Sequence, residues 1–91
     1  MNIQARIDAF FTLGDKYFNA ENQGFQEAKW KAYNQNAWFL PEFIEQSSNQ
    51  IVTQFLQKSE MTNWVNLYPS IANANTDIKV GIVMAGNIPM V

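Results

Sequence analysis

Two side chains that dominate enzyme and metal chemistry are missing from this 91-residue chain, which contains no cysteine and no histidine. Without cysteine, these residues hold no disulfide framework, no thiolate metal site and no cysteine nucleophile. Without histidine, the commonest general base and the commonest metal ligand are missing too. Any chemistry of this chain therefore has to use other groups.

Charge and long apolar runs are also scarce. Six basic and eight acidic residues give a net charge of −2. The chain therefore lacks the excess positive charge that attracts nucleic acid or an anionic membrane. No stretch approaches the roughly 20 apolar residues of a membrane span. The N-terminus places Arg6 and Asp8 among isolated apolar residues, unlike the apolar core of a signal peptide. We therefore expect a cytoplasmic chain with no nucleic-acid partner and no membrane span.

Hydrophobic residues make up 47% of the chain and include thirteen aromatic side chains. They recur at the spacing of amphipathic helices. We predict helices over about Asn2 to Asn19, Phe25 to Gln35 and Pro41 to Gln57, and a short one after Ser59 that Pro69 ends. The faces expected to pack are Ile3, Ile7, Phe10, Phe11 and Phe18; Phe25, Ala28 and Ala32; Ile44, Ser48, Ile51 and Phe55; and Met61, Trp64, Val65 and Tyr68.

Several residues give local signals within these helices. Gly14 costs about 1 kcal/mol relative to Ala in a helix, but its lack of a side chain lets a neighbour approach closely. Pro41 favours a helix start, whereas Leu40 before it cannot cap the free N–H groups. Ser59 is expected to cap the fourth helix. Trp30 falls off the apolar stripe, so it either packs against another element or lies on an interface.

The polar residues of the third helix have a structural and a chemical interpretation. Glu42 and Glu45 share a helix face, but two carboxylates without histidine are better explained as a solvated helix start than as a metal site. Ser47 and Ser48 are better explained as solvated or close-packed serines than as nucleophiles, because no base is within reach.

The C-terminal stretch differs from the rest. A polar connector from Pro69 to Asp77 is followed by the apolar run Val80–Met84, which is typical of a strand buried on both faces of a parallel sheet. We therefore predict a mainly α chain of three to four helices followed by one strand. We expect residues 1–77 to form the helical segment and residues 78–91 to form the first strand and turn of a truncated α/β domain. On this interpretation the chain is the front piece of a longer protein.

Asn87 follows this strand and is the candidate catalytic residue. In doubly wound sheets the ligand lies beyond the carboxyl ends of the strands, where an amide can donate to an oxygen that gains negative charge. The alternative is that Asn87 only caps the turn into the next helix, since Asn is a common turn former.

Two motifs resemble a known family. The stretch from Val80 to Met90, Val-Gly-Ile-Val-Met-Ala-Gly-Asn-Ile-Pro-Met, is similar to a motif of the aldehyde dehydrogenase superfamily. It looks most like the acyl-CoA reductases related to the fatty-aldehyde-forming reductase of luminous bacteria. Asn36-Ala37-Trp38-Phe39-Leu40-Pro41-Glu42 resembles a second motif of that family, in which Thr stands where this chain has Leu40. The N-terminal Arg6–Phe10 stretch is a weaker third likeness.

The resemblance implies NADPH-dependent reduction of a fatty acyl-CoA to an aldehyde by the whole protein. It also implies that the truncated α/β domain begun by residues 78–91 is a nucleotide-binding domain. Asn87 would polarise the reacting oxygen, and Met84, Ala85 and Gly86 would line the wall near the nicotinamide. The nucleophilic cysteine is not among these residues, so the chain alone is expected to be inactive.

A different class of function is also open, since four amphipathic helices with short loops form a small bundle that would serve as a free-standing interaction module. Under either hypothesis Ile78 to Val91 presents an unpaired apolar strand. Such a strand is expected to be disordered or to pair with another copy, which predicts a homo-oligomer.

Overall fold

The structure, a computed structural model, describes residues 2–73, 77 and 79–83. The described part is mainly helical, as predicted, and contains no strand. Its elements are α1 (Ile3–Thr12), the π-helix η1 (Leu13–Tyr17), α2 (Gln23–Gln35), α3 (Pro41–Gln54), α4 (Lys58–Asn66) and the 3-10 helix η2 (Pro69–Asn73).

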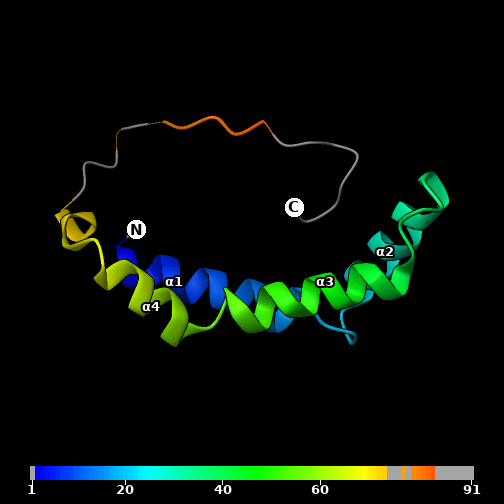
Figure 1. Ribbon diagram of the computed structural model, residues 1–91, viewed down its shortest axis with the longest axis horizontal. Helices are drawn as coiled ribbons and strands as arrows, with labels where there is room; N and C mark the ends of the chain where they lie inside the picture. The colour runs from blue at the N-terminus through cyan, green and yellow to red at the C-terminus, as the bar shows by residue number, and fades with distance from the viewer. Residues whose placement is uncertain (1, 74–76, 78, 84–91) are drawn as a thin grey trace.

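The molecule is elongated, with extents of 45 × 26 × 20 Å along its principal axes. α3 and α4 follow one another along one side, and α1 with η1 runs antiparallel to them along the other (Figure 1). α2 follows η1 in the chain and lies at one end of the molecule, where it packs against α3. Among the described residues, the helices form two layers.

The first predicted helix follows the expected path but changes its form after Thr12. Phe18 N–H donates to the Leu13 carbonyl at 3.2 Å, five residues back, which is the bond of a π-helix turn. Gly14 is buried in this turn, where an added Cβ would lie 3.1 Å from Val52 Cγ1. The predicted close approach at Gly14 is thus confirmed, and the neighbour is α3.

The second helix ends at Gln35 as predicted, but it begins at Gln23, two residues before the predicted start at Phe25. The side chain of Asn22 accepts from Phe25 N–H at 2.9 Å, a standard N-cap.

The third helix begins as predicted at Pro41, and Leu40 before it makes no side-chain cap. It ends at Gln54 rather than Gln57, because the backbone of Gln57 is extended and its amide donates to the Val52 carbonyl at 2.9 Å. Gln57 therefore occupies the N-cap position of α4, and the predicted cap Ser59 is wrong: it lies inside the first turn.

The core is smaller than the sequence predicts. Within the described residues, Ile7 and Ile44 are the buried hydrophobic residues. The predicted core positions Phe10, Phe55 and Trp64 are 54%, 64% and 61% exposed, so their assignment to the core is wrong. A helical stripe identifies an apolar face, but a two-layer arrangement covers only the part of that face that meets the other layer.

Candidate functional site

The residues singled out for catalysis and cofactor binding, Asn87 with Met84, Ala85 and Gly86, lie outside the described residues. Of the predicted strand, residues 80–83 are described. Val80, Ile82 and Val83 are 79%, 80% and 102% exposed. Three β-branched side chains are thus uncovered by the helical layers.

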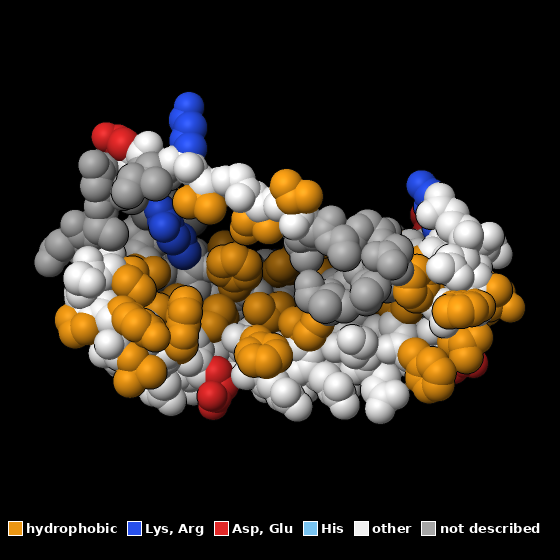
Figure 2. All heavy atoms as spheres, turned by 45° about the horizontal axis from the view of Figure 1, so that its top comes forward, with side chains coloured by type: hydrophobic (Ala, Val, Ile, Leu, Met, Phe, Trp, Pro, Cys, Tyr) orange, Lys and Arg blue, Asp and Glu red, His pale blue; other side chains and the backbone are white. Residues whose placement is uncertain are grey.

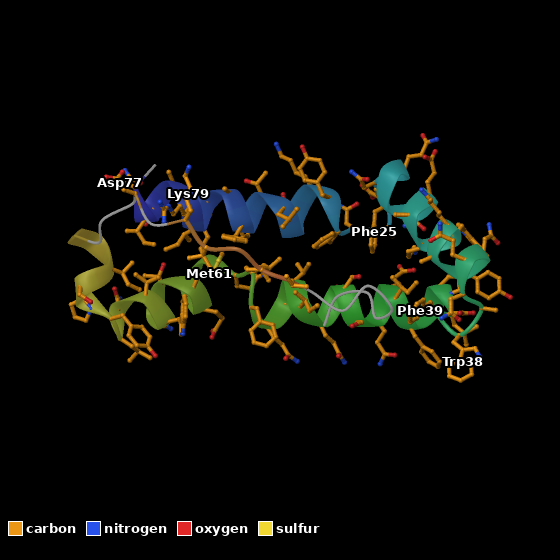
Figure 3. The ribbon with its side chains drawn as sticks, turned by 90° about the horizontal axis from the view of Figure 1, so that it is seen from above. Phe25, Trp38, Phe39, Met61, Asp77 and Lys79 are labelled. Carbon is orange, nitrogen blue, oxygen red and sulfur yellow. The ribbon has the colours of Figure 1, made fainter. Side chains whose placement is uncertain are left out.

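The second motif forms the tight turn between α2 and α3. Asn36 organises it: its side chain accepts from Trp38 N–H at 3.1 Å, and its carbonyl accepts from Phe39 N–H at 3.0 Å. The Leu40 carbonyl then accepts from Phe43 and Ile44 as α3 begins. The turn leaves the ring of Trp38 90% exposed, and this ring points away from the helices at the end of the molecule (Figure 3).

The interior between α2 and α3 holds an ion pair that sequence reasoning missed. Lys29 is only 4% exposed, and its Nζ lies 2.8 Å from Glu45 Oε2 and 5.3 Å from the centre of the Phe25 ring. Lys29 follows Phe25 by four residues and precedes Ala32 by three, so helical spacing places it on the apolar face of α2. That position could have predicted its burial. Glu45 is therefore not simply part of a solvated helix start.

Beside this pair lies a cleft of about 390 Å³ whose lining is both polar and apolar. Its lining combines the rings of Phe18 and Phe25, 5.6 Å apart, with carboxylates and amides. The lining residues are Gly14, Asp15, Phe18, Asn19, Ala20, Phe25, Glu45, Asn49 and Val52.

The cleft offers little for covalent or acid–base chemistry. Glu45 is held by Lys29, and nearby Ser48 is fully buried with its hydroxyl donating to the Ile44 carbonyl at 2.7 Å. The prediction that Ser48 is a close-packed structural serine is confirmed. Among the residues that the structure describes, no cluster of side chains could hold a metal ion.

A second, apolar groove of about 500 Å³ runs between α1 and the junction of α3 and α4. Figure 3 shows Met61 between α1 and α4. The side chains that line it are Phe10, Gln54, Phe55, Leu56, Glu60, Met61 and Trp64. We call this surface the apolar groove. No helix in the described part is long and apolar enough to span a membrane.

Comparison of the chain with protein-family models, with curated proteins and with solved structures finds no match.

Proposed function

We propose that this chain is the N-terminal portion of an NADPH-dependent acyl-CoA reductase that converts a fatty acyl-CoA to a fatty aldehyde. The observation that carries the proposal is the Val80–Met90 motif, with Asn87 following the apolar run. The helices form a non-catalytic lead-in to the nucleotide-binding domain.

Two structural features support this assignment. The Asn36–Glu42 segment opens α3 with Pro41 at its start, as the second motif requires. The β-branched residues of the 80–83 run are almost fully exposed, and such a run gains stability when a parallel sheet covers both of its faces.

In the proposed reaction, the amide of Asn87 donates to the substrate oxygen as that oxygen gains negative charge. NADPH, when bound, would supply the hydride, and Met84, Ala85 and Gly86 would line the nicotinamide side of the site. The acyl group would pass from CoA to a cysteine elsewhere in the whole protein, forming a new thioester and releasing the CoA thiol, and hydride transfer would then release the aldehyde and restore the cysteine. These 91 residues contain no cysteine. The chain alone is therefore expected to be inactive.

The test is a reductase assay of the product of the complete reading frame, which follows NADPH consumption with a long-chain acyl-CoA. We expect Asn87→Ala to lower kcat by roughly 10²- to 10³-fold, the cost of removing one oxyanion donor. Asn34→Ala, which removes an exposed amide of α2, is the matched control and should leave kcat unchanged. A protein without acyl-CoA-dependent NADPH consumption, or with equal activity in both variants, would contradict the proposal.

A free-standing helical interaction module is the second candidate, and the exposed apolar groove and the exposed Trp38 favour it. The coding region discriminates between the two: continuation into further strands and a downstream cysteine supports the reductase, whereas a stop codon after Val91 supports the module. The predicted homo-oligomer through the C-terminal strand belongs to both proposals.

A further inference from the structure

The described C-terminal run, residues 79–83, lies over an apolar face of the helical layers without packing on it. Figure 1 shows the run above the helices and roughly parallel to the long axis of the molecule. Seen from above, it crosses the seam between α1 and α4 in the part of the seam where Met61 lies (Figure 3). Hydrophobic side chains line the face of the helical layers below the run (Figure 2). The run itself is almost fully exposed, so both apolar surfaces are left in water.

The apolar groove is the hollow part of this seam. Met61 lines it, and its aromatic members are all more than half exposed. Val80 and Ile82 are two residues apart, so in an extended chain they point to the same side and can enter the groove together. Their aliphatic side chains carry no polar atom that burial would leave without a hydrogen bond. The run therefore matches the groove in chemistry.

The run is tethered beside the groove. In the groove wall, the ring of Trp64 meets that of Tyr68 at 5.9 Å, and η2, which begins at the next residue, packs against α4. From Asn73, where η2 ends, to Val80 the chain spans up to about 24 Å when fully extended. This reach exceeds the shortest dimension of the molecule, 20 Å. The run can therefore reach the groove of its own chain, and the tether gives it a high effective concentration there.

We propose that the run closes over the apolar groove as a strap, with Val80 and Ile82 as the side chains that fill it. Closure removes apolar surface from water on the run and on the groove at once, which favours it over the open position. The closed strap is the intramolecular alternative to the homo-oligomer predicted from the sequence. It does not depend on the reductase assignment: in a longer protein, a sheet would compete with the groove for the same run.

The charges beside the groove and the run agree with closure. Glu60 is the charged residue in the lining of the groove, and Lys79 directly precedes the apolar part of the run. Neither side chain makes a hydrogen bond or ion pair within the described part of the chain. Their nearest charged neighbours in sequence are engaged elsewhere, since Lys58 pairs with Asp8 and Asp77 has an interaction of its own. Closure thus brings a carboxylate and an ammonium together.

The experiment follows the fluorescence of Trp64 in the 91-residue chain. Trp30→Phe and Trp38→Phe leave Trp64 as the only tryptophan. In this background Ile82→Asp should increase the quenching of Trp64 by acrylamide, because losing one buried aliphatic side chain lowers the ratio of closed to open strap by roughly 10-fold or more. Ile82→Leu keeps the side chain apolar and should leave the quenching unchanged. Since Ile82 is 80% exposed, both variants should keep the helical circular dichroism.

The matched control moves the reporter away from the groove. Trp30→Phe and Trp64→Phe leave Trp38, which is 90% exposed in the α2–α3 turn, and Ile82→Asp should not change its quenching. Sedimentation equilibrium distinguishes closure within one chain from pairing between copies: the protection of Trp64 should persist at concentrations at which the chain is a monomer. Equal quenching of Trp64 in Ile82→Asp and Ile82→Leu, or protection found only where the chain is a dimer, would overturn the proposal.

Discussion

At the scale of single residues, the most informative group is the ammonium of Lys29. It is taken out of water almost completely, while its partner Glu45 keeps 49% of its side chain exposed. The two partners therefore differ. Without Lys29, the carboxylate of Glu45 would still be solvated by water, whereas without Glu45 the ammonium of Lys29 would not. The face of the Phe25 ring, 5.3 Å from Nζ, adds a weaker attraction.

This asymmetry predicts which of two variants, Glu45→Ala or Lys29→Met, loses more stability. Glu45→Ala leaves a buried charge without its hydrogen-bond acceptor and should lower the free energy of unfolding by about 1–3 kcal/mol. Lys29→Met removes the charge while keeping most of the volume, so it should cost less, under about 1.5 kcal/mol. Urea unfolding followed by circular dichroism measures both. An equal or larger loss for Lys29→Met would show that the ion pair, rather than the buried charge, sets the cost.

At the scale of elements, the starts of α2 and α3 contrast. Asn22 caps α2 by accepting from Phe25 N–H, and its own amide donates to the Lys16 carbonyl at 3.1 Å. Leu40 stands at the equivalent position of α3 with an extended backbone (φ −62°, ψ 134°) and no side-chain hydrogen bond. The backbone at Leu40 is thus already in the conformation that a capping residue needs.

We predict opposite effects of substitution at these two caps. Asn22→Ala should lower the free energy of unfolding by about 1 kcal/mol, and Leu40→Asp should raise it by about 0.5–1 kcal/mol, because a carboxylate accepts from the free N–H groups and interacts well with the helix dipole. Urea midpoints of the two variants and the wild type measure both changes. If Leu40→Asp proved destabilising, the packing of the leucine would outweigh the missing cap.

At the scale of the whole molecule, α1 and α4 meet through Lys58, whose Nζ lies 2.9 Å from Asp8 Oδ1 and 5.0 Å from the centre of the Phe11 ring. The hydrogen bond from Lys58 is the main cause that lowers the pKa of Asp8; the charge of Lys58 and the amide of Gln4 add to it, and partial desolvation opposes it. Asp8 therefore holds its proton less tightly in the folded protein than in the unfolded chain.

Because the pKa of Asp8 is lowered in the folded protein, the stability of the protein falls at acidic pH. The contribution of Asp8 to stability is fully present above its unfolded pKa of about 3.9 and is lost as the pH falls through the lower folded pKa. The difference in urea midpoint between wild type and Asp8→Asn should thus be constant above about pH 5 and shrink below about pH 4. Lys58→Met should abolish the same pH-dependent part. A difference that does not vary with pH would contradict the role of this pair.

Much of the helical organisation was determined by the sequence alone. The spacing of apolar residues located all four helices, Pro41 located the start of α3, and Gly14 marked the place where another helix comes close. These features depend on neighbours within a few residues, which is why local reasoning finds them. Asn87 and the strand before it remain predictions, since they fall wholly or partly outside the described residues.

Only the tertiary structure decided which apolar faces are covered. Phe55 and Ile44 have the same helical periodicity, yet Ile44 is buried and Phe55 is 64% exposed, because burial depends on which residues of the other layer lie opposite. The burial of Lys29 and of Gly14 arises in the same way, because α3 packs against α2 and Val52 of α3 lies close to Gly14. Periodicity fixes which side of a helix is apolar, and packing between distant parts of the chain decides how much of that side leaves the water.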